Sequence, residues 1–461
     1  MAALLRTDTC ALSTPRTSGV LLAAFETYPR SWILDSLRGV EPRSSASLPS
    51  AGDQENVMSL PVEGPFAGLK LVDSDSHYSE PYDLWTSRAP AKYRDVVPQV
   101  REDSKGVLRW WVGDTPLFMA GGASFVNKAG EKTPMHSIDI TVGMDWNQIH
   151  EASYDAKARL EVMDKMGIWA QIVYPNTMGF AAYAIINQLD RDAGAAIVSI
   201  YNDAVAEWQA EGDDRLFPMA VLPFWDIEAS VAEVERVQAM GLRGITMAGN
   251  PHMGGLPDLG QPDWEPLYEI LSHYKMPINI HVGSTSSTTS GQDHNAAWPS
   301  LEKRAVKPVN SVQMELNNSR FISNLVVSDI LLKYPDLKWV SVESGIGWIP
   351  YVLERIDYEY REEFPNYTPP NKPPALEMFR KGIYGTFWFE HAGPVLLLDY
   401  LGADNVMWET DFPHPTCLYP SPVERSAEAL KDVDPVSVRK IMQDNAAQLY
   451  NLPLEKAQPS Q

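Results

Sequence analysis

The sequence of 461 residues predicts a (β/α)8 barrel, in which eight parallel strands are each followed by a helix. Short apolar runs alternate with stretches of helical spacing from Leu69 to the end of the chain. The runs are hydrophobic along nearly their whole length, as expected for a parallel sheet that is covered on its other face. The sequence after the first run lacks the Gly-x-Gly-x-x-Gly turn that would favour an open, doubly wound sheet.

Eight apolar runs are expected to form the strands of the barrel. In chain order they cover residues 69–72, 168–174, 217–222, 242–247, 277–282, 337–342, 383–389 and 405–408. Helical spacing predicts helices over residues 156–166, 183–211, 226–240, 265–273, 319–334, 347–362 and 394–401. A further helix should begin after Ser421, because Ser-Pro-Val-Glu is a capping box with proline at the first helical position.

Two insertions, after strands one and five, interrupt the regular alternation. Residues 78–150 contain a predicted hairpin, with its turn at Gly113-Asp114, and residues 284–316 are polar and rich in Ser, Thr and Asn. Long insertions of this kind often act as lids or substrate loops. Four aromatic residues either form apolar walls for a substrate or simply pack in the core, which is the commoner role: Trp110, Trp111, Phe118 and Trp388.

Charge and cysteine content restrict the class of protein. The net charge of −22 and the pI near 4.8 argue against nucleic acid and anionic membranes as partners. An anionic small molecule is still compatible, since a bound metal ion reverses the field locally. Two cysteines, Cys10 and Cys417, exclude a disulfide scaffold or a cysteine-based zinc site and fit the reducing cytoplasm. No apolar run approaches the ~20 residues of a membrane span.

Residues 1–57 differ in composition from the remainder, being rich in Ser, Arg, Ala and Thr without a lasting period. We expect either a disordered arm or upstream sequence translated from a start codon chosen too early, with Met58 as the true start. A targeting segment is the less favoured alternative, because Val20–Phe25 is short for a signal peptide and no clear cleavage site follows it. Residues 58–461 are then the barrel domain.

Four of the predicted strands end in residues that bind metals or transfer protons. In a barrel these strand ends meet at one face, where the active site lies. Carboxylates and imidazoles are ligands of divalent cations. A single histidine at a strand end usually has a backbone partner, but four such strands together predict a mononuclear metal site. The residues are Asp75 and His77 after strand one, His281 after strand five, Glu343 after strand six, and Asp411 and His414 after strand eight.

These motifs resemble the amidohydrolase-related (amidohydrolase 2) branch of the amidohydrolase superfamily, which includes aminocarboxymuconate-semialdehyde decarboxylase, aromatic-acid decarboxylases and some hydrolases. The resemblance runs from about Leu69 to Leu452 and rests on five segments: residues 73–81, the strand before His281, and residues 343–350, 410–414 and 445–450. It implies a homo-oligomer, expected to be a dimer, and one divalent ion held by Asp75, His77, His281 and Asp411.

Two positions depart from the pattern of the relatives. Many of them carry His-x-His on strand one, whereas Asp75 replaces the first histidine here, as in aromatic-acid decarboxylases. Zn²⁺ is the expected ion, but the additional carboxylate shifts the preference toward Mn²⁺. The decarboxylases have a histidine after strand six, where this chain has Glu343. A carboxylate cannot be the cationic partner of a substrate carboxylate, so Glu343 is a ligand, a general base or an anchor of the following turn.

Two enzyme reactions fit these residues. In hydrolysis of a small carbonyl or carboxylate compound, a metal-bound water attacks and Asp411 or Glu343 takes up the proton, with His414 as a third catalytic candidate. In decarboxylation of an aromatic or unsaturated acid, Asp411 protonates the carbon as CO2 departs. The departure at Glu343 narrowly favours hydrolysis. A barrel that has lost activity and only binds a ligand is disfavoured, because every metal-type position is retained.

Overall fold

The computed structural model describes residues 64–134, 143–179, 189–284, 296–363 and 372–455. They all belong to one compact unit, which spans Val57–Gln461. The expectation for residues 1–57 lies outside the described residues.

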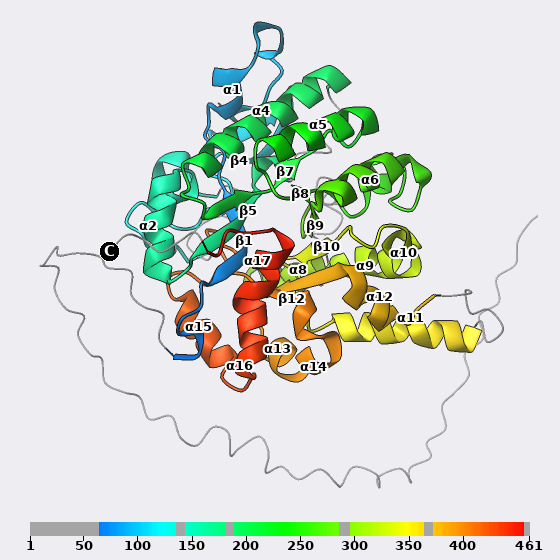
Figure 1. Ribbon diagram of the computed structural model, residues 1–461. Helices are drawn as coiled ribbons and strands as arrows, with labels where there is room; N and C mark the ends of the chain where they lie inside the picture. Colours follow the sequence, from blue (N-terminus) through cyan, green and yellow to red (C-terminus); the bar gives the residue numbers. More distant parts are fainter. Residues whose placement is uncertain (1–63, 135–142, 180–188, 285–295, 364–371, 456–461) are drawn as a thin grey trace, which may run out of the picture. The chain divides into compact units, whose positions relative to one another are not determined.

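Eight parallel strands follow one another around a barrel, as predicted (Figure 1). The third strand has two parts, β6 and β7, because Met219 interrupts it, yet the Met219 N–H still donates to Val173 O at 2.8 Å. Each strand pairs with the next strand in the chain. The strands are β1 (Val72–Tyr78), β5 (Ala170–Pro175), β6 (Leu216–Pro218), β7 (Ala220–Val221), β8 (Ile245–Thr246), β9 (Ile278–His281), β10 (Trp339–Val342), β11 (Ile383–Phe387) and β12 (Val406–Trp408).

The ring closes between the first and the last strand. Ser76 of β1 forms a parallel bridge with Phe412, which follows β12. Two hydrogen bonds flank this bridge, from Asp411 N to Asp75 O at 2.9 Å and from His77 N to Phe412 O at 2.7 Å. We call this junction the seam of the barrel.

Helices surround the strands, and an aspartate caps several of them at the N-terminus. Asp155, Asp190 and Asp226 each accept a hydrogen bond from the backbone N–H three residues later. The helices are α1 (Leu84–Arg88), α2 (Ala156–Met166), α4 (Arg191–Ala210), α5 (Ile227–Ala239), α6 (Glu265–Tyr274), α8 (Lys303–Glu315), α9 (Asn318–Val327), α10 (Ile330–Lys333), α11 (Ile349–Glu363), α12 (Ala375–Gly382), α13 (Ala392–Leu396), α14 (Leu398–Leu401), α15 (Pro422–Ala429), α16 (Pro435–Arg439) and α17 (Asn445–Leu449). None of the described helices is long and apolar enough to cross a membrane.

The core has two parts. Apolar side chains between the strands and the outer helices form the larger cluster. The smaller one fills the barrel and includes Ile172, Phe217 and Val340 together with Tyr450, which directly follows α17. The Tyr450 hydroxyl donates to Asn279 Oδ1 at 2.6 Å. Arg243, just before β8, donates to the carbonyl of Asn451, so α17 covers the end of the barrel at which the strands begin.

Three details of the predicted elements were wrong. The first strand is Val72–Tyr78 rather than 69–72, so Asp75 and His77 lie within it. The helix predicted over 319–334 divides into α9 and α10, and the one near 394–401 into α13 and α14. The helix after Ser421 begins at Pro422 as expected, but the serine side chain makes no capping hydrogen bond.

The two insertions contain regular structure. The hairpin predicted in the first insertion is present, formed by β3 (Leu108–Val112) and β4 (Thr115–Met119), and β2 (Gln99–Glu102) extends it to three antiparallel strands. The second insertion, which was expected only to be polar, contains helix α8. The first part of the helix predicted over 183–211 lies outside the described residues, and its described part is α4.

Candidate metal centre

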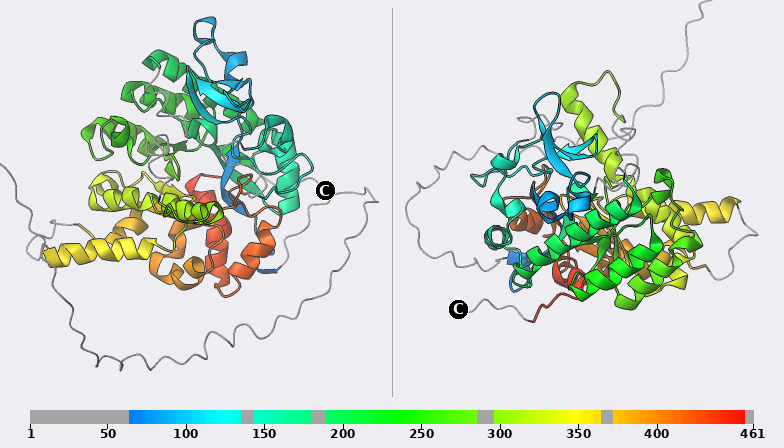
Figure 2. Two further views of the ribbon diagram at one scale, coloured as in Figure 1. Left: turned by 180° about the vertical axis from the view of Figure 1, so that it is seen from behind. Right: turned by 90° about the horizontal axis from the view of Figure 1, so that it is seen from above.

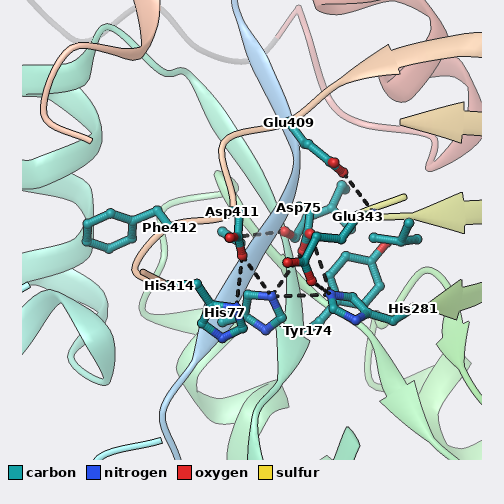
Figure 3. A network of polar contacts seen from close by, with 12 residues as sticks. Asp75, His77, Tyr174, His281, Glu343, Glu409, Asp411, Phe412 and His414 are labelled. Carbon is teal, nitrogen blue, oxygen red and sulfur yellow. Dashed lines mark hydrogen bonds and ion pairs between the residues drawn. The ribbon is translucent and has the colours of Figure 1, made fainter. Parts of the chain in front are cut away.

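The six residues selected from the sequence meet at the end of the barrel where the strands finish (Figure 3). They form two overlapping groups, and within each group the possible ligand atoms lie within 4.8 Å of one another. One group is Asp75, His77, His281 and Glu343, and the other is His77, Glu343, Asp411 and His414. None of the six is more than 9% exposed, so the cluster is closed off from bulk water.

The two histidines His77 and His281 stand at the middle of the cluster. Their Nε2 atoms are 3.2 Å apart. The two oxygens of Asp75 contact one ring each, at 3.4 Å from His77 Nε2 and 3.5 Å from His281 Nε2. Asp411 Oδ1 lies 3.5 Å from His77 Nε2, and Glu343 Oε2 lies 3.4 Å from His281 Nε2. Asp75 and Glu343 therefore converge on the two ring nitrogens, and Asp411 joins the cluster through His77 Nε2.

Backbone and side-chain contacts fix how the rings are turned. His281 Nδ1 lies 2.7 Å from Val282 O, and a carbonyl oxygen only accepts, so we assign the proton to Nδ1. The lone pair of His281 Nε2 then faces the cluster, which is the arrangement of a metal-ligating histidine. The His414 ring stacks on the His77 ring, with centroids 3.6 Å apart, and its Nε2 lies 2.7 Å from Asn176 Oδ1.

Two carboxylate residues of the cluster have unusual backbone angles. Glu343 has φ of 53° and Asp411 has φ of 61°, which places both in the left-handed region that side chains other than glycine rarely adopt. Each is close behind a barrel strand, where the turn brings the side chain over the mouth of the barrel. Strained backbone of this kind concentrates at functional sites.

Burial and the crowded carboxylates disturb the pKa values in the cluster. Burial, followed by the charges of Asp411 and neighbouring carboxylates, raises the pKa of Asp75 and of Glu343 well above the usual range. Burial lowers the pKa of His281 to about 4 and that of His77 well below its usual range. Burial alone raises the pKa of Asp411, but the neighbouring His414 and His77 hold it well below its usual range. Neutral imidazoles do not compensate the negative charge of the carboxylates beside them, so the cluster favours a bound cation.

The contacts of Asp75 test whether a metal ion fits. Among the described residues, neither of its buried carboxylate oxygens accepts a hydrogen bond. A buried carboxylate without partners is strongly unfavourable, so a native protein normally satisfies it. A divalent cation at the point where Asp75, His77 and His281 converge would do so, with ligand types that Zn²⁺ and Mn²⁺ accept. The residues present therefore fit a divalent metal ion.

Asp73 supports the cluster from below and was not selected from the sequence. Its carboxylate accepts hydrogen bonds from Thr410 N at 2.7 Å, Thr410 Oγ1 at 2.5 Å and Gln171 Nε2 at 2.8 Å. Buried Arg159 extends the network, because it donates to Gln171 Oε1 at 3.0 Å and to His77 O at 2.6 Å. Asp73 thus ties the residue before Asp411 to the strand that carries Asp75. The sequence offered one signal, since Asp73 opens the same acidic motif.

Three other polar residues near the cluster were also missed. Thr416 Oγ1 donates to Asp411 Oδ2 at 2.9 Å, and Asn176 holds His414 as described above. Glu409 is fully buried below the cluster, and its Oε2 accepts a 3.4 Å hydrogen bond from Glu343 N. Burial, followed by the charge of Asp75, raises the pKa of Glu409 well above its usual range.

Of the four aromatic residues considered as substrate walls, the three with described side chains are held by separate contacts. Trp110 is fully buried and packs edge-on against Trp85, with centroids 5.0 Å apart, so its role is packing. Trp111 lies on the β3 strand, where Arg101 stacks over its ring at 4.9 Å. Trp388 is buried after β11 and contacts Phe389. The side chain of Phe118 lies outside the described residues.

Comparisons with known proteins identify relatives of this chain. Residues 172–452 match the model of the amidohydrolase family. The γ-resorcylate decarboxylases of Rhizobium sp. (strain MTP-10005) and Rhizobium radiobacter are each 24% identical over 342 residues, which is 70% of this chain and 95% of the relative.

Solved structures share the fold. An amidohydrolase from Mycobacterium avium subsp. paratuberculosis K-10 is similar with a TM-score of 0.64 and 22% identity, over 83% of this chain and all of that one. The manganese-bound 5-carboxyvanillate decarboxylase of Novosphingobium aromaticivorans DSM 12444 gives a TM-score of 0.54 at 17% identity, over 84% of this chain and 98% of that one. The predicted barrel and the predicted relationship are both confirmed. The chain belongs to the amidohydrolase family and is a metal-dependent hydrolase or carboxy-lyase.

Proposed function

We propose that the protein is a non-oxidative decarboxylase, which releases CO2 from a small aromatic or unsaturated carboxylic acid. The supporting observation is the similarity to two γ-resorcylate decarboxylases along 95% of their length, in a chain that keeps a complete metal-type cluster at the barrel mouth. The geometry of the cluster alone is equally compatible with hydrolysis. The narrow preference for hydrolysis drawn from the sequence is therefore replaced by the alternative that the sequence had left open.

In this proposal Asp75, His77, His281 and Asp411 hold one divalent ion. Once bound, the ion would neutralise the negative charge on the substrate's oxygens and would so favour loss of CO2. Two imidazoles and two carboxylates suit Mn²⁺ as well as the Zn²⁺ expected from the sequence. Two of the structurally similar decarboxylases, from Polaromonas sp. JS666 and Novosphingobium aromaticivorans, contain manganese. Loading the metal-free protein with each ion separately would identify the active one.

Asp411 is the residue we assign to proton transfer. When the bond to CO2 breaks, the carbon keeps the electron pair and must receive one proton. Asp411, which the neighbouring histidines keep ionised, takes this proton from His414 and passes it to the carbon. His414 Nδ1 lies 2.9 Å from Asp411 Oδ1, so this histidine can supply the proton again from solvent. Thr416 donates to Asp411 Oδ2 at 2.9 Å and Asn176 contacts the far side of the His414 ring, so both groups are held in place.

Hydrolysis is the second candidate, and Glu343 is the observation that favours it. Its carboxylate reaches the cluster at 3.4 Å from His281 Nε2, where a general base for a water molecule would be useful. The same position in the decarboxylases resembled by this sequence is a histidine. If the enzyme is a hydrolase, we expect Glu343 to act as the general base. If it is a decarboxylase, we expect Glu343 to bind the metal or to support its ligands.

One assay separates the two reactions. Protein loaded with Mn²⁺ or Zn²⁺ is incubated with a panel of hydroxybenzoates, amides and lactones, and CO2 release is scored separately from hydrolysis. We expect CO2 from at least one hydroxybenzoate, lost on chelation and restored by metal. Asp411→Asn should lower this rate on the order of 10²-fold or more, whereas Asp404→Asn, at an exposed ion pair with Lys440, should not. Cleavage of an amide or lactone without any CO2 release would contradict the proposal.

A further inference from the structure

The first insertion is bonded to the segment that carries His414. Figure 2 shows its three-stranded sheet, β2–β3–β4 (light blue), outside the ring of barrel strands. After this sheet the chain returns to the seam, where Phe125 N donates to Pro413 O at 2.9 Å. Further along the segment, the Tyr419 hydroxyl donates to Gly130 O at 2.6 Å. The insertion therefore contacts the chain on both sides of His414.

A turn of the insertion, Gly121-Gly122, reaches two buried polar side chains at the barrel mouth. The hydroxyl of Ser79, which directly follows β1, donates to Gly121 O at 3.4 Å. Asn176, which directly follows β5, donates from Nδ2 to Ser79 Oγ at 3.2 Å. A serine hydroxyl has one hydrogen, and here Gly121 receives it, so Ser79 can only accept from Asn176. This fixes the orientation of the amide, with Oδ1 turned toward His414.

The orientation of the Asn176 amide determines how the His414 ring is used. Asn176 Oδ1 lies 2.7 Å from His414 Nε2, and an amide oxygen only accepts, so this nitrogen carries a hydrogen. The other ring nitrogen, Nδ1, lies 2.9 Å from Asp411 Oδ1 and is the one left for proton transfer. Ser79, Asn176 and Asp411 are fully buried. One chain of hydrogen bonds thus connects the first insertion to Asp411.

A side chain at Gly122 would not fit beside this chain of hydrogen bonds. A Cβ atom there would lie 2.8 Å from Asn176 Nδ2 and 3.1 Å from Ser79 Oγ, so the amide would have to move. Gly122 also has a φ of 63°, in the left-handed region that favours glycine. Glycine therefore lets the backbone of the insertion lie directly against the Asn176 amide.

We propose that the first insertion positions His414 for proton transfer, acting through Ser79 and Asn176. The inference rests on the proposed function, in which His414 supplies the proton that Asp411 passes to the carbon. A ring that could turn would present Nδ1 to Asp411 only part of the time, whereas a ring held at Nε2 presents it continuously. Ser79, Asn176 and Gly122 are positioning residues in this proposal. This part of the insertion is a fixed support for the group that supplies the proton.

The test uses metal-loaded full-length protein and two variants. Ser79→Ala removes the hydroxyl that orients the amide, and Gly122→Ala presses a methyl group against it. Each should lower kcat for CO2 release by about tenfold or more and leave KM and metal content unchanged, because only proton transfer is impaired. Proton NMR of Zn²⁺-loaded protein with isotope-labelled histidine gives a second measurement. The Nε2–H signal of His414, assigned with His414→Gln, should shift or disappear in both variants.

Two matched controls make the same kinds of change away from this chain of hydrogen bonds. Ser124→Ala removes another buried hydroxyl of the first insertion, which bonds to Ser153 Oγ at 2.8 Å. Gly106→Ala introduces a methyl group at a similar φ, 75°, where no atom lies within 4 Å of the new Cβ. Both controls should keep the wild-type kcat and the His414 signal.

Loss of kcat together with a changed His414 signal in Ser79→Ala is the required result, also where Gly122→Ala does not fold. Wild-type kcat, or an unchanged His414 signal, in Ser79→Ala would overturn the inference. An equal loss of kcat in Ser124→Ala would overturn it too, since it would show a general effect of the insertion on folding. If no acid in the panel loses CO2 but the His414 signal still depends on Ser79, the proposed function fails and the positioning of His414 stands.

Discussion

Replacing Asp73 by asparagine should loosen the seam of the barrel without changing the shape of the side chain. Asp73 accepts three short hydrogen bonds, two from Thr410 and one from Gln171, and two of them converge on Oδ2. A fourth, longer one comes from Asp75 N at 3.3 Å. Asparagine offers one acceptor oxygen, so at least one of these donors would face an NH2 group instead.

The magnitude follows from the number of donors that lose their acceptor. A lost hydrogen bond to a charged group costs about 1.5–3 kcal/mol, and removing a buried charge returns part of this. We therefore expect Asp73→Asn to lower the free energy of unfolding by about 1–3 kcal/mol. Since burial raises the pKa of Asp73 to about 7, the comparison belongs at about pH 8.5, where the carboxylate is ionised.

Thermal unfolding of metal-free and metal-loaded protein measures this effect, and competition with a chelator gives the metal affinity. Asp103 provides a matched control, because its carboxylate also accepts three hydrogen bonds, from Lys105 N, Val107 N and Arg109 Nε. Asp103→Asn should lower the Tm but leave the metal affinity unchanged. The reasoning is refuted if Asp73→Asn binds metal as tightly as the wild type, or if Asp103→Asn weakens metal binding as much.

Three further predictions concern single residues. His281→Ala should lower the metal content far below the about one ion per chain expected for four ligands, and elemental analysis showing full occupancy would exclude it as a ligand. Glu343→Gln should reduce CO2 release by less than about tenfold at normal metal content, whereas a loss near 10²-fold would favour a general base and hydrolysis. Burial raises the pKa of Glu80 to about 6, so the folded protein favours the protonated carboxyl group. The stabilisation that this gives is fully present below about pH 4.5 and is lost as the pH rises through about 6. Glu80→Gln should therefore flatten the dependence of Tm on pH in this range, and an unchanged slope would contradict the assignment.

Apolar runs predicted all eight strands, because the barrel buries those strands on both faces. The first strand was displaced in the prediction, since Asp73, Asp75 and His77 are polar and yet buried within it. Hydrophobic patterns cannot reveal a strand whose polar side chains find partners on distant segments, such as Gln171 and Thr410 for Asp73. Helix α8 was missed because it lies in an insertion of largely polar sequence and Pro308 interrupts its pattern.

The residues of the candidate site were predicted more completely than the residues that hold them in place. The rule that active sites lie at strand ends brought together Asp75, His77, His281, Glu343 and the pair Asp411 and His414, and the structure places all of them in one cluster. Asn176 and Thr416 were missed because asparagine and threonine are common in turns, and only the fold shows which ones touch the site. The roles of the cluster residues, the dimer and the cytoplasmic location remain predictions.

Because the metal centre lies across the seam, metal binding should also affect the dynamics of the barrel. The backbones on either side of it are joined at one bridge, Ser76 to Phe412, and Asp73 adds hydrogen bonds from Thr410. The proposed ligands Asp75 and Asp411 lie on opposite sides. An ion held by both would link the first strand of the barrel to the segment after the last. At 100 times its Kd, a metal that binds only the closed form stabilises it by about 2.7 kcal/mol. Amide hydrogen exchange at His77 and Asp411 should then slow on metal binding, so that these two amides report whether the ring is locked or free to open.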